Sequence, residues 1–312
     1  MILGLTRCFR TMLTLIIALA TGIAIISAVW WFSPLRRWTS TFQQRSPGCS
    51  LSDLSTAYRV RGERVRAIAD VRQNSRLVRE EPGIELWSTP SGEWWAPKGH
   101  SPFLLEVVAE MGCSVYSTRQ AEVRTGDVVL DCGAHVGCFT SQALKLGASV
   151  VVAIEMEPKY LDCLRRNLAS EIASGRVIVY PGGVWDHNKT MPLDDILAIE
   201  SAGPDSPSAS PGQPAAIQVK LTTIDDLVQE LGLRQVDFIK MDIEGAEVRA
   251  LMGAAQTLAR SRPRMAIAGY HYRNDCETIP AAVRQALPAY QSEFGPWYST
   301  RGIRPETIFF HA

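Results

Sequence analysis

The chain has 312 residues, a formal net charge of zero at pH 7 and 46% hydrophobic residues, enough for one sizeable domain with additional segments. The balanced charge removes the simplest argument for a nucleic-acid-binding protein, because such proteins usually carry a surplus of basic residues. The seven cysteines are irregularly spaced and form no Cys-x-x-Cys pair, which argues against a disulfide framework or a zinc knuckle. No nucleic-acid partner is therefore expected.

The first clear pattern is an uncharged apolar segment at residues 11–32. About 20 such residues are needed for a helix to cross the core of a bilayer, and the aromatic residues that end at Phe32 would lie in the interfacial belt. A cleaved signal peptide is the alternative, but its apolar region is usually shorter and ends in small residues. We expect residues 1–32 to form a single-pass membrane anchor. Arginines flank both ends of the segment, so its orientation stays open.

Three segments are expected after the anchor. Residues 33–82 are interpreted as a linker with a helical part near 60–78, and residues 83–126 as an N-terminal cap on the main domain. The cap is expected to contain short strands or a loop with three tryptophans, followed by a helix at 102–111. Those tryptophans are either a lid over a binding site or ordinary core. Residues 127–312 form the main domain.

Strand and helix patterns alternate regularly in the main domain. Strands are predicted at residues 127–131, 149–155, 176–180, 217–221, 236–242, 265–270 and 307–310, and helices at 139–146, from Pro158, 223–231, 246–258 and 277–287. A Pro/Ser/Ala-rich stretch at residues 201–216 is interpreted as a mobile surface loop. The alternation predicts an α/β fold: a three-layer α/β/α sandwich around a mostly parallel sheet. Ligands of such sheets bind outside the carboxyl ends of the strands.

The turn Asp131-Cys-Gly-Ala-His-Val-Gly137 follows the first of these strands and opens a helix. A glycine at 133 lets the backbone turn tightly and approach a ligand, and Gly137 lets the helix pack closely. The unpaired amides at the start of that helix suit a carboxylate. Glu155 ends the next strand, where a carboxylate can accept hydrogen bonds from ribose hydroxyls. The expected cofactor contacts are Asp131, Gly133, Ala134, His135, Gly137 and Glu155.

The charge at the head of this turn distinguishes between nucleoside cofactors. A nicotinamide dinucleotide needs three close glycines around its pyrophosphate, but Asp131 stands at the first of those positions and would repel it. A carboxylate suits the cationic amino and sulfonium groups of S-adenosylmethionine better. S-adenosyl-L-methionine is therefore the expected cofactor, and a nicotinamide-dependent oxidoreductase is the weaker alternative.

Three motifs resemble those of the FkbM-type methyltransferases, a family of class I S-adenosylmethionine-dependent enzymes. They are VVLDCGAHVG at residues 128–137, TTIDDL at 222–227 and VDFIKMDIEGAE at 236–247. The resemblance extends from about Trp87 to the C-terminus. His135 departs from it, since many members carry a small polar residue such as Asn there. The resemblance implies a Rossmann-like fold and methyl transfer to a hydroxyl of a sugar, glycolipid or small metabolite.

A hydroxyl acceptor must lose its proton, and three side chains near the third motif are candidates for the catalytic role. They are Asp242, Glu244 and His271. Each also has a structural interpretation: Asp242 as a group that orients the cofactor, Glu244 as a helix cap, His271 as a packed side chain. Lys240 is interpreted as a structural partner of one of these acids. A metal held by these three candidates and His135 is conceivable, but no ligand spacing supports it and no metal is expected.

Two aspects of function stay open at this stage. A scaffold protein that kept the fold but lost catalysis is the alternative from another functional class. The expected partners are a small-molecule, glycan or lipid-linked acceptor and, through the N-terminal helix, a membrane. Because S-adenosylmethionine is a cytosolic metabolite, we expect the catalytic domain to face the cytosol, although a type II arrangement would place it on the other side.

Overall fold

The computed structural model describes residue 21 and residues 46–47, 49–202, 217–299 and 303–312. The predicted anchor, apart from Thr21, lies outside the described residues, and so does nearly all of the predicted loop at residues 201–216. Within the part of the chain that the structure describes, no helix combines the length and the apolar character needed to cross a membrane.

A seven-stranded sheet forms the centre of the main domain, in the order β12-β15-β11-β10-β4-β5-β6. Its strands are β4 (Val128–Cys132), β5 (Val150–Glu155), β6 (Val177–Pro181), β10 (Phe238–Met241), β11 (Arg264–Ala268), β12 (Gln291–Phe294) and β15 (Thr307–His311). The run from β11 to β6 is parallel, and β15 is antiparallel to both of its neighbours. The prediction of a mostly parallel sheet is confirmed.

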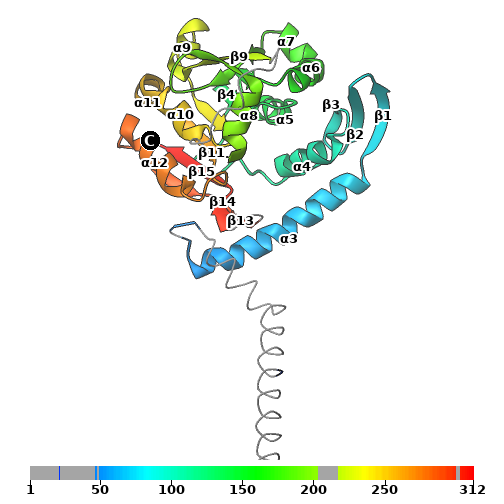
Figure 1. Ribbon diagram of the computed structural model, residues 1–312, viewed down its shortest axis with the longest axis horizontal. Coiled ribbons are helices and arrows are strands. Elements are labelled where there is room, and N and C mark those ends of the chain that lie inside the picture. Colours follow the sequence, from blue (N-terminus) through cyan, green and yellow to red (C-terminus); the bar gives the residue numbers. More distant parts are fainter. Residues whose placement is uncertain (1–20, 22–45, 48, 203–216, 300–302) are drawn as a thin grey trace, which may run out of the picture.

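Alternate residues of each central strand enter two different cores, which places helices on both faces of the sheet (Figure 1). On β4, Val129 packs with one cluster and Leu130 with the other. The first cluster includes residues of α5 (Cys138–Lys145) and α6 (Pro158–Asn167), with α7 (Ala169–Ala173) beside them. The second includes α9 (Ile224–Glu230), α10 (Glu247–Met252), α11 (Ala255–Ser261) and α12 (Asp275–Ala286). The predicted three-layer sandwich is present.

The helix predicted at residues 246–258 is divided into α10 and α11 at Gly253. A Cβ atom on Gly253 would lie 2.1 Å from the carbonyl oxygen of Trp185. The chain therefore has to pass directly against this backbone, and the helix is interrupted there. Since the cause is a contact with a distant segment, helical periodicity could not reveal it.

A small second sheet lies beside the main one and contains the strand predicted at residues 217–221. It is formed by β7 (Gly183–Val184), β8 (Lys189–Pro192) and β9 (Gln218–Thr222), and α8 (Leu193–Ala202) follows β8. The residue after β9, Thr223, caps α9 as expected, because its hydroxyl accepts a hydrogen bond from the amide of Asp226.

The segment before the main domain contains a helix longer than predicted. α3 (Leu51–Gln73) begins where Ser50 and Asp53 form a capping box, so residues 51–60 are helical and not linker. It leads into an antiparallel sheet of β1 (Arg76–Glu81), β2 (Ile84–Thr89) and β3 (Gly92–Pro97), followed by α4 (Ser101–Gly112). Trp94 and Trp95 are buried in the core that this sheet forms with α3, α4 and α6, and they are not a lid.

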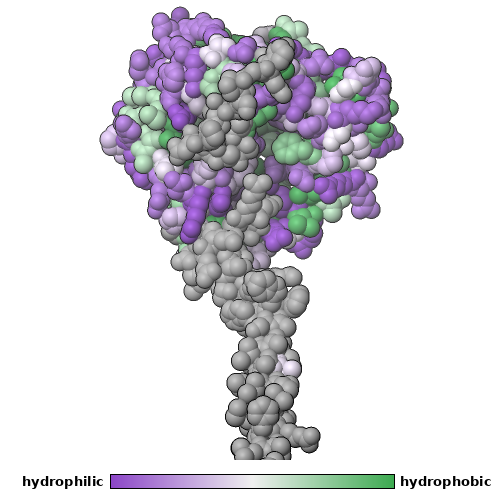
Figure 2. All heavy atoms as spheres, viewed as in Figure 1, coloured by the Kyte–Doolittle hydropathy of each residue, from purple (hydrophilic) through white to green (hydrophobic). Residues whose placement is uncertain are grey.

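The N-terminal end of α3 packs against a hairpin near the C-terminus of the chain (Figure 1). This hairpin, β13 (Trp297–Ser299) and β14 (Ile303–Pro305), was not predicted. Ala57 of α3 is buried with Trp297 and Ile303. Figure 2 shows that the face in view is mostly hydrophilic, with apolar residues in small separate groups. The large apolar side chains of the described residues are buried mainly in the cores between the layers.

Candidate active site

A cavity of about 380 Å³ lies at the carboxyl edge of the main sheet. Its wall includes a residue at or just after the end of each of five parallel strands, in strand order Gly182, Glu155, Gly133, Asp242 and Tyr270. Parallel strands bring their carboxyl ends to one edge, which is why these distant residues meet. The cavity therefore occupies the place where the sequence analysis expected a ligand.

The glycine turn between β4 and α5 is held tightly between two strands. The amides of Gly133 and Ala134 both donate to the carbonyl oxygen of Ile154 at 3.0 Å. Gly133 has φ +80°, and a Cβ there would lie 2.0 Å from the carbonyl oxygen of Asp242. Gly137 has φ +94°, and a Cβ there would lie 2.8 Å from Leu168. Both positions need glycine, and the turn presents Gly133 and Ala134 to the cavity.

Glu155 lines the cavity with its carboxylate fixed by three backbone amides. Oε2 accepts from His135 N, and Oε1 accepts from Met156 N and Glu157 N, each at 2.8 Å. Burial raises the pKa of Glu155, and the three amide donors oppose that shift. Since each carboxylate oxygen can accept about two hydrogen bonds, Oε2 retains one free position. The geometry fits one ligand hydroxyl at Glu155, not the pair expected from the sequence.

Asp131 differs from expectation, because it does not line the cavity and is fully buried. Asp131 and Lys240 are register partners on β4 and β10, and Lys240 Nζ lies 3.3 Å from Oδ1 of Asp131. The Thr140 hydroxyl donates to Oδ2 at 2.6 Å. Asp131 was expected to act through an unpaired negative charge, but Lys240 neutralises that charge. The direct cofactor contact expected at Asp131 is therefore corrected to a supporting role.

Lys240 connects Asp131 to the glycine turn. Its Nζ donates to the carbonyl oxygen of Gly133 at 2.7 Å and also lines the cavity. Burial lowers the pKa of Lys240, but the carboxylates of Asp131 and Asp242 outweigh burial and the pKa is raised. The ammonium therefore stays charged. Lys240 was expected to pair with one of the acids near the third motif, but its ion pair is with Asp131.

His135 forms part of the cavity wall between two aromatic rings. Its ring centroid lies 5.0 Å from that of Phe103 and 4.1 Å from that of Tyr160. Burial is the main cause that lowers the pKa of His135, to about 3, so the ring is neutral. Both ring nitrogens are buried and have no hydrogen-bond partner. Buried polar atoms without hydrogen-bond partners destabilise a fold, so a polar ligand that hydrogen-bonds to these nitrogens would remove that cost.

Asp242 lies on the other side of the cavity, among tyrosines. The Tyr116 hydroxyl donates to its Oδ2 at 2.7 Å, and the Tyr270 hydroxyl donates to its Oδ1 at 3.1 Å. Burial favours the protonated acid, but Lys240 and His271 outweigh it, so the pKa of Asp242 is lowered. Asp242 is thus an ionised carboxylate whose environment makes it a weak base.

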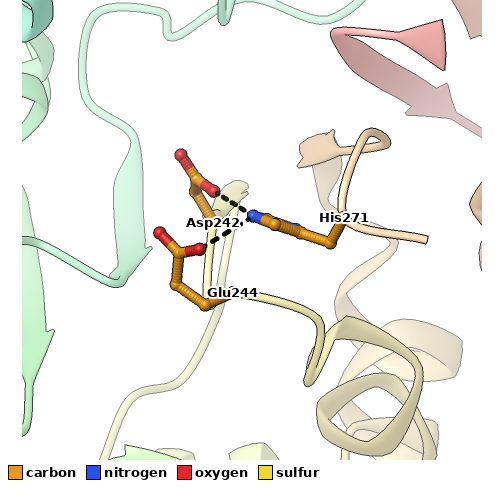
Figure 3. Close-up of side chains that lie close together, drawn as sticks. All are labelled: Asp242, Glu244 and His271. Atoms are coloured by element: carbon orange, nitrogen blue, oxygen red, sulfur yellow. Dashed lines mark ion pairs between the residues drawn. The ribbon is translucent and has the colours of Figure 1, made fainter. Parts of the chain in front are cut away.

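The three residues predicted for catalysis are neighbours in space (Figure 3). His271 Nε2 lies 3.5 Å from Oδ1 of Asp242 and 3.4 Å from Oε2 of Glu244, and its Nδ1 lies 3.1 Å from Oε1 of Glu247. Asp242 and Glu244 line the cavity, whereas His271 lies behind them. Glu244 has φ +55°, and α10 has no side-chain cap, so the capping interpretation of Glu244 is wrong. Burial lowers the pKa of His271, but the carboxylates around it raise the pKa well above its usual value.

Glu110 on α4, which was not predicted as a site residue from the sequence, also lines the cavity. Burial raises its pKa to about 7, although Arg64 Nη1 lies 2.7 Å from its Oε1. Arg64 also pairs with Glu306, so one guanidinium serves the partly buried carboxylate of Glu110 and the buried carboxylate of Glu306. No motif marks Glu110, since its partner is 46 residues away in the chain. Only the packing of α3 against α4 brings them together.

Comparison with known proteins shows similarity to methyltransferases. A family model described as the methyltransferase FkbM domain matches residues 131–294, slightly more than half of the chain. The curated methyltransferase sdnD of Sordaria araneosa is 26% identical over 161 residues, which cover 43% of this chain and 62% of that protein. The chain thus matches less than two thirds of the length of that relative.

Solved structures of methyltransferases are also similar to the chain. Methyltransferase FkbM from Methylobacillus flagellatus KT has 21% sequence identity and a TM-score of 0.46, with 69% of this chain and 56% of that chain covered. Fibrillarin from Aeropyrum pernix, solved with natively bound S-adenosyl-L-methionine, has 10% identity and a TM-score of 0.38, with 74% of this chain and 94% of that chain covered.

Proposed function

The chain belongs to the methyltransferase FkbM family, and from this premise we propose that it transfers a methyl group from S-adenosylmethionine to a hydroxyl oxygen. S-adenosylmethionine is the cofactor that the fold and the family imply. The observation that carries the proposal is that one cavity has the glycine turn and Glu155 on one side and Asp242, Glu244 and Glu110 on the other. A donor and an acceptor bound in it would lie next to each other.

The residues on the turn side fit the cofactor. The free acceptor position on Glu155 suits a ribose hydroxyl, and the unpartnered nitrogens of His135 suit a polar group of the same ligand. When bound, S-adenosylmethionine supplies an electrophilic methyl group on a sulfonium sulfur. Because β4 separates β5 from β10, Glu155 and Asp242 are about two strand spacings apart, or about 10 Å. With Glu155 at the cofactor, Asp242 and Tyr270 would therefore contact the acceptor.

The acceptor side supplies a proton acceptor. In the proposed reaction the acceptor oxygen bonds to the methyl carbon, the carbon–sulfur bond breaks with its electron pair on sulfur, and the hydroxyl proton passes to a carboxylate. Among the earlier candidates, Asp242 is held ionised by its neighbours and Glu244 is largely exposed. Glu110 has a pKa of about 7, near the value that suits general-base catalysis at neutral pH. We therefore propose Glu110 as the general base that accepts the hydroxyl proton.

The acceptor class proposed is a hydroxyl on a sugar, a glycolipid or a small metabolite. The cavity wall on this side is partly aromatic, with Tyr116 and Tyr270, and aromatic faces suit such ligands. The experiment is methyl transfer from labelled S-adenosylmethionine to a panel of glycans, glycolipids and small alcohols. A labelled ether in one class identifies the acceptor. Absence of transfer to every class, in a protein that binds the cofactor, would favour the scaffold alternative.

The uncharged segment at residues 11–32 supports a further proposal, that the chain is anchored in a membrane with its catalytic domain on the cytosolic side. An arginine near the centre of a membrane helix costs about 2.5–3.5 kcal/mol on insertion scales. The double variant Ile16→Arg/Ile23→Arg should therefore move the full chain from the carbonate-resistant membrane fraction to the supernatant. Equal extraction of both proteins would contradict the anchor.

A further inference from the structure

The pair of carboxylates beside His271 has the composition and spacing of a cation site. Asp242 follows β10 and His271 follows β11, and these neighbouring parallel strands end at the same edge. One ligand atom from each of Asp242, Glu244 and His271 can be chosen so that all lie within 4.8 Å of one another. Figure 3 shows both carboxylates directed toward the same edge of the imidazole ring.

The imidazole is held as a metal-ligating histidine usually is. Such a histidine turns one nitrogen to the metal and the other to a carboxylate or carbonyl behind it. Nδ1 of His271 lies 3.1 Å from the carboxylate of Glu247, which is 1% exposed and also accepts from the amide of Ile243 at 3.0 Å. Nε2 is thereby directed between Asp242 and Glu244.

The same nitrogen lacks a satisfactory partner. The His271 side chain is 8% exposed, and neither of its ring nitrogens makes a hydrogen bond of good geometry. At 3.4 and 3.5 Å, the two carboxylate oxygens that Nε2 faces are farther than ordinary hydrogen-bond partners. Adjacent ligands of an octahedral cation with bonds of about 2.1 Å lie about 3 Å apart, so small side-chain adjustments would complete the arrangement.

The negative charge around His271 and the position of two of its carboxylates on the cavity wall also support a cation site. Three carboxylates, Asp242, Glu244 and Glu247, surround one imidazole, and a divalent cation offsets such an excess better than a single proton. Asp242 and Glu244 line the cavity, so an ion on them could also bind a ligand oxygen. Carboxylate oxygens suit Mg²⁺ and Mn²⁺, whereas imidazole suits transition-metal ions, so this mixed set favours Mn²⁺ within that class.

We propose that Asp242, Glu244 and His271 bind one divalent cation of the Mg²⁺ or Mn²⁺ class, with Glu247 as the residue that positions His271. The cation's role rests on the proposed function: it would bind the acceptor hydroxyl oxygen, orient it toward the methyl group and lower the pKa of the hydroxyl. The proton still passes to a carboxylate of the cavity. His135, the fourth residue considered for a metal, lies between Phe103 and Tyr160 and is not part of the site.

The test is calorimetric titration of the full chain with Mn²⁺ alone, without cofactor. The variant is Glu244→Gln, because the side chain is 63% exposed and its replacement should not disturb folding. The matched control is Glu157→Gln, which removes another carboxylate of the same cavity, one that is paired with Lys159. We expect one Mn²⁺ per wild-type chain, binding weakened at least tenfold in Glu244→Gln, and a change below twofold in Glu157→Gln.

Two results would overturn the site: no saturable Mn²⁺ binding by the wild type, or an equal loss in the two variants. Titration of the same preparations with S-adenosylmethionine separates this proposal from the proposed function. Cofactor binding without Mn²⁺ binding contradicts the cation site alone. Mn²⁺ binding without cofactor binding contradicts the proposed function and leaves the cation site supported.

Discussion

Nη1 of Arg64 lies 2.7 Å from Oε1 of Glu110, and this pair connects α3 to the wall of the cavity. α3 and α4 both precede residues 131–294, which match the family model, so Arg64 and the proposed base Glu110 both lie outside that match. The same guanidinium contacts Glu306, just before β15. α3 is therefore part of the active-site architecture.

The first prediction concerns the pH dependence of methyl transfer. The pKa of Glu110 is about 7, raised chiefly by burial and further by Glu306, Asp242 and Glu106, while Arg64 lowers it. The base form is populated above that pKa, so the rate should rise as pH increases through about 7. Glu110→Gln should remove this rise of the rate with pH and lower kcat about 10²- to 10⁴-fold at pH 8. A variant with the wild-type pH profile would contradict the assignment.

Removing the guanidinium should destabilise the fold. Arg64→Met leaves Glu306 buried, and Glu110 partly buried, without their shared cation; breaking a buried ion pair such as Arg64–Glu306 costs about 3–5 kcal/mol. Urea denaturation measures the change. Arg59→Met on the same helix is the control, because Arg59 forms only an exposed pair with Glu63 and should cost less than about 0.5 kcal/mol. Similar midpoints for the two variants would show that the buried pair is energetically unimportant.

Gly133→Ala should abolish cofactor binding through a backbone clash. Its Cβ would lie 2.0 Å from the carbonyl oxygen of Asp242, so the turn has to move. Gly83 has a similar φ, +84°, but open space around the added Cβ. Gly83→Ala should therefore cost only the backbone strain, about 1 kcal/mol, and leave cofactor affinity unchanged. Equal cofactor affinity in the two variants would mean that the turn does not need this close approach.

The buried pair Lys240–Asp131 should show strong coupling in a double-mutant cycle. Lys240→Met alone leaves Asp131 as an unpaired buried charge, at a cost of about 3–5 kcal/mol. Asp131→Asn in the same chain removes that charge and should recover part of the loss. Denaturation of the two single variants and the double variant gives the coupling energy, and additive effects would contradict the pairing.

Local patterns were sufficient to predict most of the main domain. Alternating apolar strands and glycine-terminated helices predicted the sheet, because burial of both of its faces leaves a signal in each segment separately. β12, β13 and β14 were missed, since they are short and two of them form a hairpin stabilised by the distant α3. The division of α10 from α11 at Gly253 was missed for a related reason: it depends on a contact with Trp185.

The candidate site was predictable where its residues lie at or shortly after the end of a strand recognisable in the sequence. Glu155, Asp242 and Glu244 occupy such positions and line the cavity. Glu110 escaped notice because its pKa depends on burial and on partners from other elements. Asp131 was misinterpreted because a charge read from sequence shows no partner, and Lys240 becomes its neighbour only through the pairing of β4 with β10.

The most direct test of the central claim is calorimetric titration of the full chain with S-adenosylmethionine. The account predicts one binding site per chain. Affinity should fall about 10- to 100-fold in Glu155→Ala, since a hydrogen bond to a charged group contributes about 1.5–3 kcal/mol. Glu93→Ala, at an exposed carboxylate on β3, should bind like the wild type. Absence of binding by the wild type, or equal affinity in Glu155→Ala and the wild type, would contradict the account.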